Sequence, residues 1–287
     1  MIPGSFDYHR PSSIDAALSL LGSLGDEARV VAGGHSLIPM MKLRMAVPEH
    51  LIDLQDIEDL KGISIEGGSV SIGAMTTQTN LIASEQLAAV CPIIGTAAEQ
   101  IADPQVRNKG TIGGNLANGD PGNDMPALMQ ALDAKYVLQN SGGTREVAAR
   151  DFYEAAYFTA LDEGEILTAV RFAAPASGHG YAYEKQKRKI GDYATAAAAV
   201  VLTVSNGSCQ SASIALTNVG DTPLYAEAAS NALVGTTLDG EAIAAAARAA
   251  KAIADPAADG RGPADFRLHV AGIMVSRAIQ TAADRAN

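Results

Sequence analysis

The sequence predicts an α+β fold in three consecutive pieces. Short apolar strands alternate with helix patterns near the N-terminus, which favours a parallel sheet. Further along, Gly-Gly and Asn-Gly pairs separate runs of alternating polarity, which favours antiparallel hairpins. Helix patterns dominate the C-terminal end. We therefore expect two α/β subdomains at residues 1–55 and 56–177, followed by a C-terminal domain of helices packed on a small sheet at residues 178–287.

The first piece has the pattern of a small βαβ unit. Ser12 is a suitable N-cap for a helix whose apolar residues recur at three- and four-residue spacing, and Gly25 ends that helix. The remaining elements are expected as a strand at 29–32, a helical turn at 37–43 and a strand at 51–54.

The second piece combines two hairpins with two helices. These are expected as hairpins at 63–72 and 135–148 and as helices at 93–102 and 123–132. Pro92 begins the first helix, and Asp103-Pro104 stops it. A long glycine-rich loop joins the two helices.

The third piece follows a linker rich in proline and glycine around residues 175–180. Two apolar runs, at 194–204 and 209–218, are separated by Asn206-Gly207, the strongest short-range signal for a hairpin. Helices are expected at 223–234, 240–254 and 263–283.

Composition excludes several classes of function. A net charge of −11 repels nucleic acid and anionic membranes. Two cysteines, Cys91 and Cys209, supply neither a CxxC motif nor a disulfide framework, so we expect no metal site in this chain. The N-terminus lacks a signal-peptide pattern, and no apolar run is long enough to span a membrane. We expect a cytoplasmic protein, with peripheral association at the inner face of the cytoplasmic membrane as the alternative.

The first candidate motif is Ala32-Gly33-Gly34-His35-Ser36, between a strand and a helix. Adjacent glycines let backbone N–H groups approach an anion closely, and the start of a helix favours negative charge. The alternative is a plain strand-to-helix turn. His35 by itself is expected to be a packed or hydrogen-bonded residue rather than a catalyst, because no second ligand lies at metal-binding spacing.

The second candidate is the segment 109–124, which has five glycines within the thirteen positions 110–122. Loops of this length are usually functional or disordered, and its Thr, Ile and Leu residues argue against disorder. The chain has no P-loop, GxGxxG, HExxH or GxSxG motif. Two separate Gly-Gly turns on two α/β pieces suggest a pyrophosphate held between them.

The third candidate is the segment 185–193, where four basic residues fall within five positions of an acidic chain. Lys185 and its neighbours could form a cationic wall beside a bound anion, with Tyr193 supplying an aromatic face. The alternative is a solvated strand face, and the pattern by itself does not separate the two.

These motifs resemble those of a known family. AGGHS at 32–36, TIGGN at 111–115, NGDPGNDMPALMQALDA at 118–134 and KRKIGDYATAAAAVVL at 187–202 are similar to the FAD-binding medium chains of molybdenum hydroxylases, the xanthine dehydrogenase family. The similarity is greatest to the medium subunits of aerobic carbon monoxide dehydrogenases and extends over the whole chain. It implies a two-part FAD-binding α/β fold of the PCMH type, followed by a three-stranded antiparallel sheet with helices.

The resemblance also implies an FAD site, in which the two double-glycine turns grip the pyrophosphate. The matching positions are Val30, Val31, Ala32, Gly33, Gly34, His35, Ser36, Leu37, Ile101, Ala102, Thr111, Ile112, Gly113, Gly114, Asn115, Asp124, Leu167, Lys185, Asp192 and Tyr193. Lys185 and Tyr193 are expected to tune the flavin, and no residue of this chain is expected to be catalytic. We expect FAD to be bound non-covalently, because neither His35 nor either cysteine has the flanking pattern of a flavin linkage.

The implied partners are an iron–sulfur small subunit and a molybdopterin large subunit, paired as a dimer of heterotrimers. Electrons from the oxidation of CO to CO2 would pass through [2Fe–2S] clusters to FAD and then to a quinone or cytochrome. Three alternatives remain open: the flavin subunit of another molybdenum hydroxylase acting on a purine, aromatic acid or aldehyde, a stand-alone FAD reductase of the peptidoglycan-precursor type, and a flavin-free scaffold.

Overall fold

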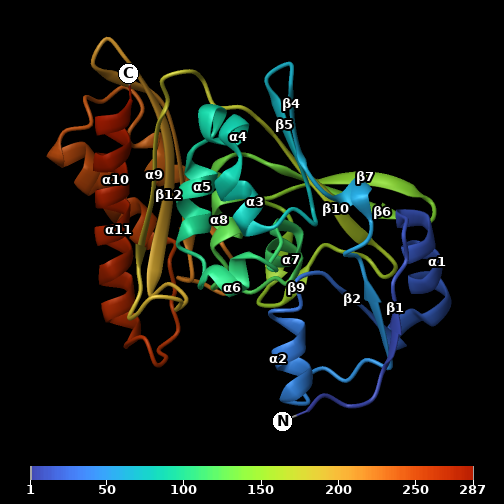
Figure 1. Ribbon diagram of the computed structural model, residues 1–287. Coiled ribbons are helices and arrows are strands. Elements are labelled where there is room, and N and C mark those ends of the chain that lie inside the picture. The colour runs from blue at the N-terminus through green and yellow to red at the C-terminus, as the bar shows by residue number, and fades with distance from the viewer. Residues whose placement is uncertain (1, 287) are drawn as a thin grey trace.

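Three main sheets follow one another along the chain in the computed structural model, which describes residues 2–286 (Figure 1). The N-terminal sheet has the order β1-β3-β2 and is entirely parallel. Its elements are β1 (Asp7–His9), α1 (Ile14–Leu24), η1 (Gly25–Glu27), β2 (Ala28–Val31), α2 (Leu37–Lys42) and β3 (His50–Asp53), followed by η2 (Glu58–Leu60). The predicted parallel sheet is confirmed.

Two details of this piece differ from the prediction. Strand β1 was not expected, because its three residues carry no apolar alternation and become a strand only by pairing with β3. Ser13, and not Ser12, caps α1, since the Oγ of Ser13 accepts a hydrogen bond from the N–H of Ala16. Gly25 ends the helix as predicted, with a positive φ of 54°.

The middle sheet is antiparallel and has the order β4-β5-β10-β6-β7. Its strands are β4 (Ile63–Glu66), β5 (Ser69–Gly73), β6 (Lys135–Asn140), β7 (Gly143–Ala148) and β10 (Ile166–Ala173). A small two-stranded sheet is formed by β8 (Tyr153–Ala155) and β9 (Phe158–Thr159). Both predicted hairpins are confirmed.

The middle helices are α3 (Gln78–Ala83), α4 (Glu85–Val90), α5 (Ile93–Glu99), α6 (Pro104–Arg107), α7 (Ile112–Ala117) and α8 (Asp124–Ala131). The predicted helix at 93–102 is too long, because α5 ends at Glu99 and Asp103 instead caps α6 through its carboxylate. The glycine-rich segment is not a structureless loop: it contains α7, which Thr111 caps. Helices α3 and α4 were not predicted.

The third sheet has three long antiparallel strands and a short fourth, in the order β11-β12-β13-β14. They are β11 (Gly180–Gln186), β12 (Ala196–Ser205), β13 (Ser208–Thr217) and β14 (Leu224–Tyr225), followed by α9 (Glu227–Asn231), α10 (Gly240–Ala252) and α11 (Ala264–Arg285). Asn206 and Gly207 both have positive φ, 52° and 73°, as the predicted two-residue turn requires.

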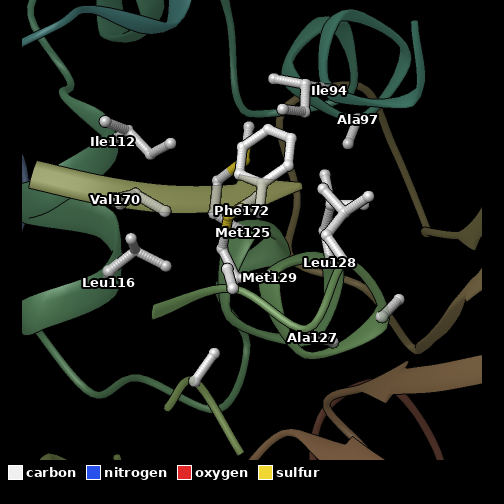
Figure 2. Close-up of a cluster of buried hydrophobic side chains, with 14 of the residues drawn as sticks. Ile94, Ala97, Ile112, Leu116, Met125, Ala127, Leu128, Met129, Val170 and Phe172 are labelled. Carbon is white, nitrogen blue, oxygen red and sulfur yellow. The ribbon is translucent and has the colours of Figure 1, made fainter. Parts of the chain in front are cut away.

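Strand β12 is buried on both faces, which explains its uninterrupted apolar run. Ala197 and Ala199 belong to the core of the middle piece, whereas Ala196 and Ala198 belong to the core beneath α10 and α11. Figure 1 shows α10 and α11 on one side of this sheet and α5 and α8 on the other. Figure 2 shows the middle core, where α7, α8 and β10 bring Ile112, Met125 and Phe172 together. Among the described helices, none is both long and apolar enough to cross a bilayer.

The approach of α11 to β11 depends on Gly180. A Cβ at this position would overlap the carbonyl oxygen of Ala282 on α11, and backbone cannot yield as a flexible side chain can. We therefore expect Gly180→Ala to destabilise the protein by about 1–3 kcal/mol, the range for an overpacked core. Gly22→Ala in α1 meets open space and should add about 0.5–1 kcal/mol through helix propensity. Urea unfolding measures both, and equal stability of the two variants would contradict this packing argument.

Candidate functional site

One cavity of about 630 Å³ lies where the three pieces of the chain meet. Its walls include β2 and the following turn, parts of the segment 110–124, the start of β10, Lys185, and residues 191–193. All but one of the twenty residues predicted from the sequence line it; the exception is Ile112, whose side chain is fully buried in the middle core (Figure 2). The volume falls within the ~300–1,000 Å³ usual for small-molecule and cofactor sites.

The first glycine turn presents unpaired backbone donors to this cavity. Within residues 2–286, the amide N–H groups of residues 33–37 have no hydrogen-bond acceptor, and all five residues line the cavity. Gly34 has a φ of 73°, which only glycine adopts readily. Successive amides around a left-handed residue are typical of backbone nests, which are concave. Such a row binds anions.

The second glycine turn has a different role. The amides of its residues 112–115 already donate to Thr76, Ala74 and Thr111. A Cβ at Gly113 would lie 2.5 Å from the Cβ of Ala74, so this glycine is required for packing. Of the two turns, the first is therefore the stronger anion site.

The two glycine motifs pack directly against each other. A Cβ at Gly33 would overlap the carbonyl oxygen of Lys109, and a Cβ at Gly114 would lie 3.5 Å from the Cβ of Ala32. Gly33 therefore allows the two chain segments to approach each other, in addition to offering its own amide to the cavity.

Two asparagines attach the second motif to helix α8. Asn115 Oδ1 accepts from the N–H of Met125 at 3.2 Å, and Asn123 Nδ2 donates to the carbonyl of Asn115 at 2.7 Å. These contacts fix the start of α8, where Asp124 is the first residue.

A buried ion pair lies in the wall between the middle and third pieces. Lys185 Nζ donates to Asp124 Oδ2 at 2.7 Å, with the two side chains 1% and 6% exposed. Asp124 Oδ1 also accepts from the hydroxyl of Tyr183 at 2.6 Å. Burial raises the pKa of Asp124, while the Lys185 ammonium opposes that shift.

The basic residues that follow Lys185 differ in burial and in their hydrogen-bond partners. Lys187 is half-buried and donates to the carbonyl of Gln100, and burial lowers its pKa. Arg188 pairs with Asp192 at 2.8 Å, and this hydrogen bond lowers the pKa of Asp192. Lys189 is exposed. Of the two interpretations left open, a cationic wall fits Lys185, and a solvated surface fits Lys189.

Tyr193 lies at the mouth of the cavity and is 40% exposed. Burial of its hydroxyl raises its pKa. His35, in contrast, is exposed and makes no hydrogen bond to any described residue, so the expectation of a packed or hydrogen-bonded histidine is wrong. Among residues 2–286, no group of three or more His, Cys, Asp or Glu could hold a metal ion.

Sequence reasoning missed several cavity residues, of which Gln78 is the most informative. It is 1% exposed, and within the described residues neither Nε2 nor Oε1 of its amide has a partner. An unsatisfied buried amide is costly, and Gln78 lines the cavity. The unpredicted helix α3 places it there, with Thr77 as a cap that the sequence could have revealed. Tyr157 and Glu165 were missed because neither belongs to a local motif.

These features fit an elongated, anionic cofactor such as FAD. The free amides of residues 33–37 suit a pyrophosphate, and the ammonium of Lys185 suits an electron-rich ring. Apolar walls that include Ile101 and Leu167 suit flat aromatic groups.

Comparison with known proteins agrees with this chemistry. Residues 4–175 match the FAD binding domain in molybdopterin dehydrogenase, and residues 181–282 match the CO dehydrogenase flavoprotein C-terminal domain. The carbon monoxide dehydrogenase medium chain of Afipia carboxidovorans is 64% identical over 286 residues, covering 100% of this chain and 99% of that one. The corresponding chain of Hydrogenophaga pseudoflava is 51% identical over 282 residues, covering 98% of each.

A solved structure shows the same fold. The crystal structure of the Cu,Mo-CO dehydrogenase in its cyanide-inactivated form contains a chain that superposes with a TM-score of 0.99 at 64% identity, covering 100% of both chains. The chain therefore belongs to the flavoprotein family of the molybdopterin dehydrogenases, with an FAD-binding domain followed by a CO dehydrogenase flavoprotein C-terminal domain.

Proposed function

We propose that this chain is the FAD-carrying medium subunit of an aerobic, molybdenum-dependent carbon monoxide dehydrogenase that oxidises CO to CO2. The observation that carries the proposal is the 64% identity to a carbon monoxide dehydrogenase medium chain over the whole length. FAD, when bound, accepts electrons and passes them on singly or in pairs. The part of this chain is to bind, orient and tune it.

In this proposal, different cavity residues bind different parts of FAD. The amides of residues 33–37 bind the pyrophosphate, and the remaining predicted residues surround the rest of the cofactor. Lys185 and Tyr193 tune the flavin, whereas Ile112 contributes through the core that supports its turn. The proposed domain limits are 1–55, 56–177 and 178–287, each of which contains one of the three main sheets.

The remaining redox centres belong to partner subunits in this proposal. An iron–sulfur small subunit supplies electrons through [2Fe–2S] clusters, and a molybdopterin large subunit oxidises CO. The two buried cysteines of this chain are too few to ligate a cluster. We propose a dimer of heterotrimers that delivers electrons to a quinone or cytochrome, in the cytoplasm or peripherally at its membrane.

The proposal is tested on the complex purified through a tag on this chain. We expect the two partner subunits to co-purify and CO to bleach the flavin absorbance. After acid precipitation, the yellow colour should pass into the supernatant, because FAD is held non-covalently. Colour retained in the pellet would refute non-covalent binding, and flavin that bleaches only with a purine, aromatic acid or aldehyde would assign the chain to another molybdenum hydroxylase.

The first glycine turn can be tested by one added methyl group. Gly33→Ala places a Cβ against the Lys109 carbonyl, so the two motifs must separate and the row of amides must shift. We expect the FAD content of the purified variant to fall below a tenth of that of the unmodified protein. This corresponds to a loss of at least about 1.4 kcal/mol in the free energy of FAD binding. Gly240→Ala, which meets open space, is the matched control and should keep full flavin content. Normal flavin content in Gly33→Ala would remove this turn from the binding site.

The buried ion pair predicts opposite changes in flavin potential. Reduction adds negative charge to the cofactor, so Lys185→Met, which leaves the Asp124 carboxylate unopposed, should lower the midpoint potential. Asp124→Asn leaves the ammonium unopposed and should raise it. The double variant, which removes both charges, should return close to the wild-type value. Spectroelectrochemical titration measures all three, and a midpoint that is the same in both single variants would show that the pair does not tune the flavin.

A further inference from the structure

We propose that Gly122, Asn218 and Arg267 form a seat that fixes the ring of Tyr193 at the mouth of the cavity. In this proposal Asn218 and Arg267 are positioning residues, which act on a bound cofactor only through Tyr193. The proposal rests on the proposed function solely for the identity of that cofactor, FAD.

Two side chains from later in the C-terminal piece hold the backbone directly after Tyr193. Asn218 Nδ2 donates to the carbonyl of Ala194 at 2.5 Å, and Arg267 Nε donates to the carbonyl of Thr195 at 3.2 Å. Both carbonyls precede β12, which begins at Ala196. The two residues that follow Tyr193 are thus anchored by side chains more than twenty positions distant in the sequence.

The same two residues also join this segment to the glycine-rich motif, Asn218 through its backbone N–H and Arg267 through its guanidinium. Asn218 has a φ of 60° and donates its backbone N–H to the carbonyl of Pro121 at 3.0 Å. Arg267, which is 3% exposed, donates to the carbonyl of Asn218 and to that of Ala257 at 2.6 Å. Pro121 directly precedes Gly122, so the support of the Tyr193 segment and the surface beneath its ring form one network.

The ring itself lies against Gly122. A Cβ there would lie 2.8 Å from Cδ1 of Tyr193, so any side chain would displace the ring. The N–H of Gly122 donates to Asp120 Oδ1 at 2.8 Å, which fixes the loop in this position. Glycine is therefore required here for the close approach of an aromatic face.

Arg267 is also linked to the Tyr193 ring through two other side chains, Asp259 and Arg261. Its guanidinium lies 3.4 Å from the carboxylate of Asp259, which also pairs with Arg261 at 2.5 Å. The guanidinium of Arg261 lies 5.7 Å from the centroid of the Tyr193 ring, within the range of a cation–π contact. A buried arginine thus contacts both the backbone two residues after Tyr193 and the carboxylate that pairs with Arg261 beside its ring.

The positioning role and a purely structural role predict different behaviour. If Arg267 only joins β12 to β13, its loss would lower stability and affect FAD binding whether or not Tyr193 is present. If it acts through Tyr193, its effect on FAD binding requires that ring. Double-mutant cycles separate these cases, because the coupling between residues of one network is measurable.

The position of the ring is tested first on the full chain without FAD. The chain contains eight tyrosines, and ¹⁹F NMR of 3-fluorotyrosine-labelled protein resolves them, with Tyr193→Phe assigning the resonance. We expect Gly122→Ala, Asn218→Gly and Arg267→Met to shift or broaden this resonance. Asn218→Gly keeps a residue that tolerates the positive φ while removing the contact to Ala194. An unchanged resonance in all three variants would overturn the proposal.

The matched control is Arg277→Met, on an exposed position of the same helix α11. It should leave the Tyr193 resonance and FAD affinity unchanged. Circular dichroism checks the fold of every variant. If Arg267→Met does not fold, Gly122→Ala and Asn218→Gly decide, because neither removes a buried charge.

The second measurement is FAD affinity by titration of the complex stripped of flavin. Gly122→Ala and Arg267→Met should each raise the dissociation constant about tenfold, within the range of coupled contacts. In a Tyr193→Ala background, neither substitution should have a further effect. A full tenfold loss in that background would overturn the proposal. Failure of the unmodified complex to bind FAD would instead refute the proposed function. The NMR result would still show whether Gly122, Asn218 and Arg267 fix the position of the Tyr193 ring.

Discussion

The cavity depends on the close approach of two backbone segments, that of Gly33 and that of Lys109. No Cβ fits between them, so the N-terminal and middle pieces can meet here only because residue 33 is glycine. This contact sets the distance between the row of free amides and the second glycine motif. The two motifs therefore form one wall. Both require glycine for packing, and only the first also leaves its backbone amides without an acceptor within the described residues.

The third piece of the chain contributes the charged side chain of Lys185 to the cavity wall. Lys185 extends from β11 to Asp124 at the start of α8, and both residues line the cavity. Removing two charges from water is expensive, and a buried ion pair seldom adds net stability. In the proposed function, the pair instead sets the electrostatic environment of the bound cofactor. Tyr183 satisfies the second carboxylate oxygen, so the pair is fully hydrogen-bonded on the acidic side.

Much of the fold was predictable because it rests on local chemistry. Asn206-Gly207 requires a tight hairpin, and Pro92 favours the start of a helix, whatever surrounds them. Strand β1 and helices α3 and α4 were not predicted, because short elements with weak periodicity are selected by their neighbours. Helix α7 was not predicted, because its two glycines oppose helix formation locally. Gly113 is required there by its close contact with Ala74, which the sequence does not show.

The sequence by itself determined the glycine turns, the order of the three pieces and the resemblance to a flavoprotein family. Each of these can be recognised from a pattern of neighbouring residues, without knowledge of the contacts between distant ones. Only the tertiary structure decided which donors remain free, since the amides of Ile112 and Gly113 donate to the carbonyls of Thr76 and Ala74, more than thirty positions away in the sequence. It also separated Lys185 from Lys189, which are equivalent in charge and differ only in burial. Gln78 and Arg267 belong to no motif, and their positions follow from contacts between residues far apart in the chain. Hydrogen bonding and desolvation act through space, so the sequence identifies candidate groups and the fold determines their partners.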